Sequence, residues 1–217
     1  MGFFLLLFIT MFYPTVEDQW VSVLNPITFS QNTIEHVLND GGYAILSAGR
    51  NPATWTDLQL NDKTIQKRSE QLVDDIKDTY VYSPVIGVYD GGIETSFFIL
   101  LHNDSPDDEL EDLIQLGKKY NQDSIIYVRK DKPTIEQLIY TSGHYQGRHV
   151  EGTGYQKLPF NVTDNYSKVK LCSNMTFTFT LNFNFKYMFI DKLRIRTNQL
   201  IDHHNRNHEA NKERCRN

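Results

Sequence analysis

Six polar residues in three separate stretches of the sequence have side chains suited to binding or converting a small polar molecule. They are Arg50, Asn51, Glu94, Ser96, Gln122 and Asp123. An arginine guanidinium binds anionic groups through paired hydrogen bonds, and a carboxylate can transfer protons as a general acid or base. Glu94 is therefore the candidate catalytic residue, and Arg50 is the candidate anion-binding group. Gln122 and Asp123 would position a substrate.

A purely structural interpretation competes with this one. Asn51 precedes Pro52, and an Asn-Pro pair is an ordinary turn sequence. The amide and carboxylate of Gln122 and Asp123 can satisfy backbone groups where a helix gives way to a strand. Both interpretations require the same elements to hold these residues in place.

Residues 43–129 predict the order strand, helix, strand, strand, helix, strand. The apolar strand stretches are 43–48, 85–89, 95–102 and 124–129, and the helices are 64–78 and a second one that opens at Ser105. This order is typical of an α+β, ferredoxin-like split βαβ (βαββαβ) core. We expect the spatial strand order 4-1-3-2 in an antiparallel sheet, with both helices on one face. The ends of the first two strands and the starts of the last two then share one edge, which collects the six polar residues.

Three motifs resemble those of a small bacterial and phage family that has no assigned activity. The motifs are Ser47-Ala48-Gly49-Arg50-Asn51-Pro52, Gly87 with Glu94-Thr95-Ser96, and Tyr120-Asn121-Gln122-Asp123-Ser124. In that family a strand ends in Asn-Pro, a middle strand opens with Glu-x-Ser, and a Gln-acid pair precedes the last strand. The resemblance covers residues 43–129 and implies the same fold and edge cluster, without a function. This sequence departs from it by having Gly49-Arg50 where the family has an aromatic residue.

The sequence divides into a predicted core and two extensions. We expect a core domain at 43–145, an N-terminal segment at 1–42 with an apolar run and a short helix, and an irregular C-terminal extension at 146–217. The extension contains a Phe-rich stretch, 176–187, in which apolar and polar residues alternate as in a strand with one apolar face, and it ends in a polar tail.

The apolar face of the Phe-rich strand needs cover, because a row of exposed Phe side chains is unstable in water. The open face of the central sheet, the apolar run at 3–13 or a second copy of the chain would supply it. We favour the run at 3–13 and hence a monomer. Pairing between two copies would instead give a homodimer.

Composition argues against several classes of protein. The net charge of -5 and the pI near 5.8 provide no general attraction for a nucleic acid. Cys172 and Cys215 stand in no zinc-binding spacing, and we expect free thiols. The histidines at 203, 204 and 208 lack the His-Glu-x-x-His pattern, so we expect no metal site. No glycine spacing matches a phosphate-binding loop, and we expect no cofactor.

The apolar run at 3–13 also bears on location. It is shorter than the roughly 20 residues that span a bilayer. It lacks a basic segment before it and a small-residue cleavage site after it. We therefore expect a cytoplasmic protein, with secretion or membrane association through this run as the alternatives.

These features favour a small intracellular binding or interaction module that uses the polar edge to hold a small polar ligand or a protein partner. The alternative is an enzyme that acts on a small polar or nucleotide-like substrate. A second alternative is a structural protein that assembles through the Phe-rich strand. A raised pKa of Glu94 in an enclosed site would favour the enzyme.

Overall fold

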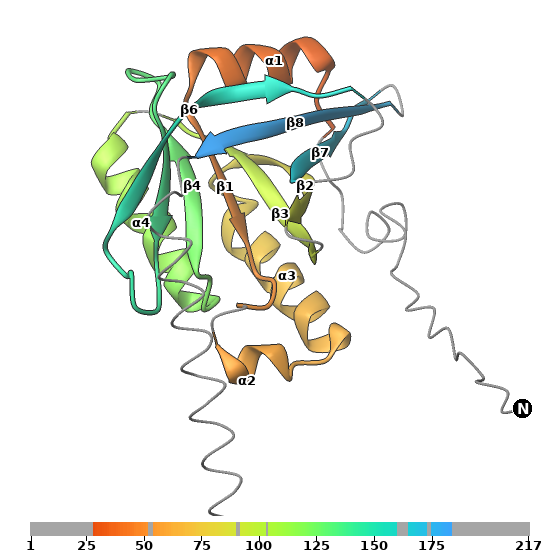
Figure 1. The fold of residues 1–217 in the computed structure, drawn as a ribbon, viewed down its shortest axis with the longest axis vertical. Coiled ribbons are helices and arrows are strands. Elements are labelled where there is room, and N and C mark those ends of the chain that lie inside the picture. Colours follow the sequence, from red (N-terminus) through yellow and green to blue (C-terminus); the bar gives the residue numbers. More distant parts are fainter. Residues whose placement is uncertain are drawn as a thin grey trace, which may run out of the picture.

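In the described part of the chain, eight strands close into an antiparallel β-barrel (Figure 1). The computed structural model describes residues 28–51, 54–89, 92–102, 104–159, 165–172 and 175–183. Around the barrel the strand order is β1-β3-β2-β7-β8-β6-β5-β4, and β4 pairs with β1 to close it. The strands are β1 (Tyr43–Ser47), β2 (Val81–Tyr89), β3 (Gly92–Leu100), β4 (Ser124–Val128), β5 (Glu136–Tyr140), β6 (His149–Lys157), β7 (Tyr166–Lys170) and β8 (Thr176–Phe183).

Two of the helices begin at residues whose side chains accept hydrogen bonds from free backbone N–H groups. The helices are α1 (Gln31–Asp40), α2 (Trp55–Leu58), α3 (Asp62–Ile76) and α4 (Pro106–Lys119). The side chains of Ser30 and Asn61 accept hydrogen bonds from the backbone N–H groups of Thr33 and Thr64, which caps α1 and α3. Helix α4 opens with Pro106, carries acids in its first turn and lysines in its last, and so complements the helix dipole.

The predicted ferredoxin-like α+β fold is wrong, because the sheet continues beyond four strands and closes on itself. The order β4-β1-β3-β2 and its antiparallel pairings are those expected from the sequence. However, β2 also pairs with β7, and β8, β6 and β5 complete the circle back to β4. The stretch expected to be irregular contains β6, whose register shifts between Gly152 and Tyr155. Because the sheet closes on itself, it lacks the open second face that a four-stranded ferredoxin-like sheet would have.

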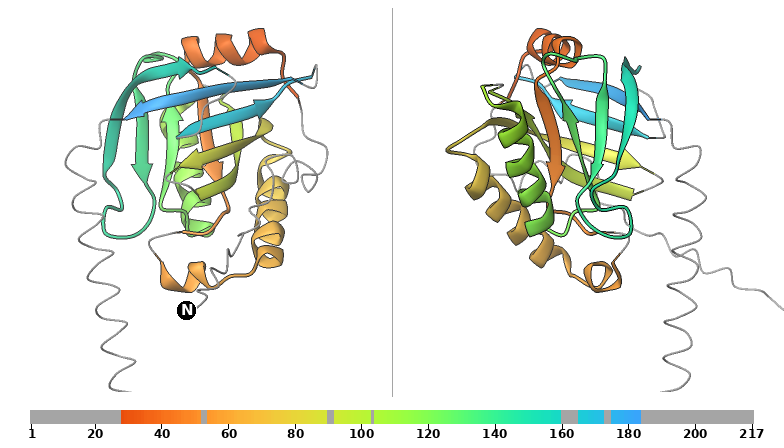
Figure 2. Two further views of the ribbon diagram at one scale, coloured as in Figure 1. Left: turned by 45° about the vertical axis from the view of Figure 1, so that its right-hand side comes forward. Right: turned by 90° about the vertical axis from the view of Figure 1, so that its left-hand side faces the viewer.

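Two apolar cores lie on opposite sides of the barrel wall. Outside the wall, α3 and α4 cover one side of the barrel (Figure 2). Leu72 of α3, Leu113 of α4 and Phe97 of β3 belong to the apolar core between them. Inside it, the ring of Tyr43 stacks on that of Phe98 with the centroids 4.9 Å apart. Helix α1 lies across one end of the barrel and contributes its buried apolar residues to the inner core (Figure 1).

The Phe-rich strand finds its cover inside the barrel. Phe177 and Phe179 of β8 are buried in the inner core together with Val85, Phe98 and Ile34. The inner face of the central sheet and helix α1 therefore cover these side chains. The apolar run at 3–13, which we favoured as the cover, lies outside the described residues, as do residues 184–187 of the predicted strand.

Within the described residues, every helix is too short or too polar to cross a membrane. The longest is α3, with 15 residues. The apolar run at 3–13, on which the membrane alternative rests, is not part of what the structure describes.

Candidate functional site

The polar residues gather at the end of the barrel that lies opposite α1. There β1 ends at Ser47, β3 begins, and β4 begins at Ser124. Side chains alternate between the two faces of a strand, so Glu94 and Ser96 share the inner row of β3 with Phe98. Ser47 stands opposite Ser96 in the register of β1 and β3. The apolar inner core thus gives way to a polar rim, which we call the polar mouth and define by Ser47, Glu94, Ser96, Gln122 and Ser124.

Gln122 connects the first and third strands within the polar mouth. Its Oε1 accepts a hydrogen bond from the backbone N–H of Ser47 at 2.5 Å, and its Nε2 lies 3.5 Å from Glu94 Oε1. The backbone oxygen of Gln122 accepts hydrogen bonds from the hydroxyls of Thr141 and Ser142, at 2.6 and 2.8 Å. Hydrogen bonds therefore fix the backbone of Gln122 while its side-chain amide faces Glu94, as expected of a residue that positions another.

The carboxyl of Glu94 lies directly against the backbone of Gly49. A Cβ atom placed on Gly49 would fall 2.5 Å from Glu94 Oε1, which is closer than non-bonded atoms approach. Ser47 prepares this turn, since its hydroxyl accepts a hydrogen bond from the N–H of Gly49 at 2.8 Å and donates to the carbonyl of Thr95 at 3.0 Å. The glycine is thus the residue that leaves room for the carboxyl.

The surroundings of Glu94 raise the pKa of its carboxyl. Burial raises the pKa of its carboxyl above the ordinary value of 4.5, a hydrogen bond with the Ser47 side chain opposes that rise, and the negative charge of Asp123 adds to it. A carboxyl whose pKa is raised by burial and by a second carboxylate is a frequent feature of acid–base sites.

Arg50 does not join this group. Its Nε and Nη2 atoms donate to the carbonyl of Leu60 at 2.9 and 2.8 Å, and Nη2 forms an ion pair of 2.6 Å with Asp62 at the start of α3. The guanidinium therefore stabilises the loop between α2 and α3. Spacing along the chain placed Arg50 at the correct edge but did not reveal the acceptors that draw its side chain away.

Asn51 has a structural position. It is 2% exposed, and its side-chain nitrogen donates to the carbonyl of Asn121 at 2.8 Å and to Ser142 Oγ at 3.0 Å. Its backbone N–H donates to Asp57 Oδ2 at 3.0 Å. These bonds tie the end of β1 to the loop that precedes β4.

Asp123 acts on the site through its charge. Its backbone oxygen accepts a hydrogen bond from the N–H of Thr141 at 3.0 Å, which fixes the residue beside β5. Its carboxylate is among the groups that raise the pKa of Glu94. With Arg50 neutralised by Asp62, the charged groups that surround Glu94 make the polar mouth a negative environment.

Sequence reasoning missed a second buried carboxyl, Glu136 of β5, at the α1 end of the barrel. The residue is 1% exposed, and it accepts hydrogen bonds from Tyr43 Oη at 3.3 Å and from the N–H of Gly154 at 3.2 Å. Burial raises the pKa of Glu136, and these two hydrogen bonds oppose the rise. The alternation of β5 would have placed Glu136 in the inner row, had the barrel been recognised.

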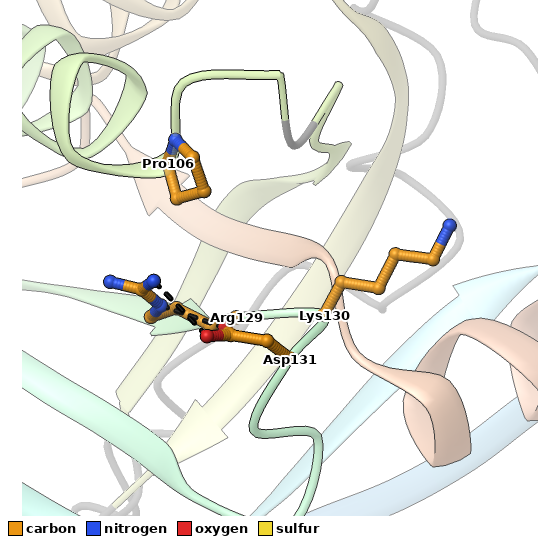
Figure 3. Close-up of a pocket in the computed structure, with 4 residues that line it drawn as sticks. All are labelled: Pro106, Arg129, Lys130 and Asp131. Atoms are coloured by element: carbon orange, nitrogen blue, oxygen red, sulfur yellow. Dashed lines mark hydrogen bonds and ion pairs between the residues drawn. The ribbon is translucent and has the colours of Figure 1, made fainter.

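A pocket of about 330 Å³ lies away from the polar mouth, beyond the other end of β4 (Figure 3). It is lined by Pro106, Arg129, Lys130 and Asp131. Arg129 makes two hydrogen bonds with the carboxylate of Asp131, at 2.8 and 3.1 Å, and a third of 3.0 Å with Asp107. Its charge is compensated on both sides, so this pocket is the weaker candidate for a ligand site.

No cluster of three or more His, Cys, Asp or Glu side chains that could hold a metal ion occurs among the described residues. The polar mouth itself offers carboxyl, amide and hydroxyl groups. These groups can bind a small polar molecule, orient it and exchange a proton with it.

Comparison with known proteins adds a family to this geometry. A family model described as the S-adenosylmethionine lyase family matches residues 45–187, a span that runs from β1 through β8 and includes the whole polar mouth. No curated protein matches the chain.

Proposed function

Because the chain belongs to the S-adenosylmethionine lyase family, we propose that it cleaves S-adenosylmethionine at its sulfonium centre without a second substrate. The observation that carries this proposal is the family match, which extends over most of the barrel. It supports the enzyme interpretation of the sequence over the binding module that we favoured. A nucleotide-like substrate was part of that alternative.

The charge of the polar mouth supports a cationic substrate. S-adenosylmethionine carries a positive sulfonium, a positive ammonium and a negative carboxylate group, so its net charge is positive. Glu94 and Asp123 offer negative charge at the mouth, while Arg50, which would repel a cation, is paired with Asp62. Opposite charges in a partly buried site attract more strongly than in water. We therefore assign Glu94 to the reacting end of the substrate.

Because no second substrate takes part, all atoms of the products come from S-adenosylmethionine. The carbon–sulfur bond breaks, the sulfur keeps the electron pair, and a neutral thioether leaves. The carbon fragment then either loses a proton from the adjacent carbon to Glu94 and forms a double bond, or closes on its own carboxylate and forms a carbon–oxygen bond. In both routes the ionised form of Glu94 is the useful one, as the base in the first and, in the second, as a counter-charge that binds the sulfonium of the substrate.

Gln122 and Ser47 would serve as positioning residues. The amide of Gln122 faces Glu94, and Ser47 holds the turn at Gly49 against which the carboxyl rests. A carboxyl fixed in this way can meet the substrate in one orientation, which lowers the entropic part of the barrier. Of the six polar residues singled out in the sequence, Glu94 would thus react and Gln122 would support it, while Arg50 and Asn51 bond to the loop around α2 and to the loop before β4.

The test is to incubate the full chain with S-adenosylmethionine alone and to identify the products by mass spectrometry. A lyase gives two products whose masses sum to that of the substrate, whereas hydrolysis gives a pair that is heavier by one water. Deuterium on the carbon next to the cleaved one is lost in the elimination route and retained in the ring-closing route. Unchanged S-adenosylmethionine after long incubation would refute the proposal.

A further inference from the structure

Three successive backbone oxygens of the turn between α4 and β4 each accept a hydrogen bond from a side chain of another part of the chain. The donor and acceptor residues are Arg68 with Tyr120, Asn51 with Asn121, and both Thr141 and Ser142 with Gln122. The donors belong to α3 and to the residues that follow β1 and β5. The turn that carries Gln122 is thus held from three directions.

Asn121, in the middle of this turn, has a left-handed backbone conformation. Its φ is +52°, a value that costs free energy for any residue with a side chain, although asparagine tolerates it better than most. Such a conformation persists where surrounding contacts impose it, and the side chain of Asn51 bonds directly to the Asn121 carbonyl at 2.8 Å. The conformation of Asn121 sets the direction in which the chain presents the next residue, Gln122.

Asn51 contacts this turn by a second route and is itself fixed. Its Nδ2 donates to Ser142 Oγ at 3.0 Å, and the same hydroxyl donates to the carbonyl of Gln122 at 2.8 Å. The backbone N–H of Asn51 donates to Asp57 Oδ2, which also pairs with Arg68 Nη1, each at 3.0 Å. A buried ion pair therefore anchors the residue that holds the turn.

The side chain of Gln122 makes two contacts that depend on the position of this turn. Its Oε1 accepts a hydrogen bond from the N–H of Ser47, and its Nε2 lies 3.5 Å from Glu94 Oε1. The second distance is at the upper limit for a hydrogen bond, so a small shift of the turn would break the contact.

We propose that Asn51 is a positioning residue of the polar mouth, which holds the amide of Gln122 against Glu94 through the Asn121 carbonyl and the Ser142 hydroxyl. The effect on the reaction rests on the proposed function. Asn51 is 2% exposed and acts through Gln122 without touching the substrate. A carboxyl whose neighbour is fixed in this way meets the substrate in one orientation.

Amide hydrogen exchange tests the positioning without turnover. The N–H of Ser47 bonds to the Gln122 side chain, so Asn51→Ala should accelerate its exchange about tenfold, the effect of one lost hydrogen bond, while the other amides of β1 keep their rates. Glu136→Ala removes a buried side chain at the opposite end of the barrel and controls for a general loss of stability. In that variant Ser47 should exchange no faster relative to the rest of β1. A Ser47 amide that keeps its rate in Asn51→Ala, or accelerates only together with all of β1, would overturn the inference.

A second variant covers the case in which Asn51→Ala does not fold. Ser142→Ala removes one of the two routes from Asn51 to Gln122 and leaves the bond to the Asn121 carbonyl in place. It should accelerate exchange at Ser47 selectively, by a smaller factor than Asn51→Ala. No selective acceleration in Ser142→Ala would count against the inference in the same way.

Steady-state kinetics tests the consequence for the reaction. Asn51→Ala should lower kcat for S-adenosylmethionine about tenfold or more while KM stays within about threefold, because the residue orients a group and does not bind the substrate. In a Gln122→Ala background the same substitution should change kcat by less than about twofold, since Asn51 acts through Gln122. Losses that multiply in the double variant, or an unchanged kcat in Asn51→Ala, contradict the inference.

The two proposals can fail separately. If the chain cleaves S-adenosylmethionine but Asn51→Ala changes neither the exchange of the Ser47 amide nor kcat, the positioning inference is wrong and the proposed function stands. If exchange at Ser47 accelerates selectively but the unmodified chain leaves S-adenosylmethionine intact, Asn51 positions Gln122 and the proposed reaction is wrong.

Discussion

The carboxyl of Glu94 occupies the space that a side chain at Gly49 would need, with Oε1 2.5 Å from the position of a Cβ. Gly49→Ala should therefore displace Glu94 and lower kcat/KM about a hundredfold, because a shift of about 1 Å in a reacting group has an effect of this size. Gly87→Ala is the matched control, since its Cβ would lie at an ordinary 3.8 Å from the Glu94 carbonyl. Equal activities of the two variants would show that the placement of Glu94 does not matter.

The rate of cleavage should depend on pH through Glu94. Its pKa lies above 4.5, and the ionised form is the active one, so kcat/KM should rise with pH and level off above that raised pKa. Asp123→Asn removes a negative charge that raises this pKa, so the rise should move to lower pH. Asp131→Asn, at the far end of β4, should leave the profile in place. A profile that Asp123→Asn does not shift would exclude Glu94 as the titrating group.

The ion pair between Asp57 and Arg68 should stabilise the fold. The two side chains are 11% and 14% exposed and lie 3.0 Å apart. Arg68→Ala leaves a buried carboxylate and should lower the free energy of unfolding by about 3 kcal/mol in urea denaturation. Lys77→Ala, which breaks an exposed pair with Asp74, should have little effect. Equal effects of the two substitutions would contradict the buried role.

The same ion pair also has a pH signature. Burial alone would raise the pKa of Asp57, but the hydrogen bonds from Asn51 and Arg68 outweigh it and lower the pKa. The stabilisation is therefore complete at neutral pH and is lost as the pH falls through the lowered pKa of the folded chain. Arg68→Ala should accordingly show a weaker loss of stability in acid than the unmodified chain.

Glu136 should influence stability without influencing catalysis. Its raised pKa means that the folded chain holds this proton more tightly than the unfolded chain, so its contribution to the free energy of unfolding falls as the pH rises between the two pKa values. Glu136→Gln removes this dependence and should be at least as stable at neutral pH. Glu136→Ala leaves the Gly154 N–H and the Tyr43 hydroxyl without their acceptor and should cost roughly 1–3 kcal/mol. A Glu136→Gln variant that loses as much stability as Glu136→Ala would show that the charge itself is required.

The central strands were predictable because their information is local. The apolar runs at 43–48, 85–89, 95–102 and 124–129 and the helices between them predict the order β4-β1-β3-β2, which brings Glu94 close to Gln122. Closure of the barrel was not predictable in this way. It depends on pairings of β2 with β7 and of β6 with β8, which lie outside the four-strand motif expected from the sequence, and on a β6 strand whose glycines and register shift hide the alternation. The face of the central sheet was among the covers considered for the Phe-rich strand, but the expectation of four strands favoured the run at 3–13 instead.

The candidate site shows the same limit at the level of side chains. Strand ends place Arg50 near Glu94, but the side chain follows the nearest acceptors, Leu60 O and Asp62. Conversely, the role of Gly49 is visible only in the structure, where the carboxyl of Glu94 lies against it. The periodicity of the sequence predicts which residues lie at an edge of the sheet. The direction of each side chain depends on which hydrogen-bond acceptors and charges lie nearest to it.

The measurement that tests the central claim most directly compares cleavage of S-adenosylmethionine by the Glu94→Gln and Glu136→Gln variants. Both substitutions replace a carboxyl of raised pKa in the inner row of the barrel, at opposite ends. Glu94→Gln should lower kcat/KM by about a hundredfold or more with little change in melting temperature, while Glu136→Gln should keep its activity. Full activity of Glu94→Gln, or an equal loss in both variants, would contradict the assignment of the reaction to the polar mouth.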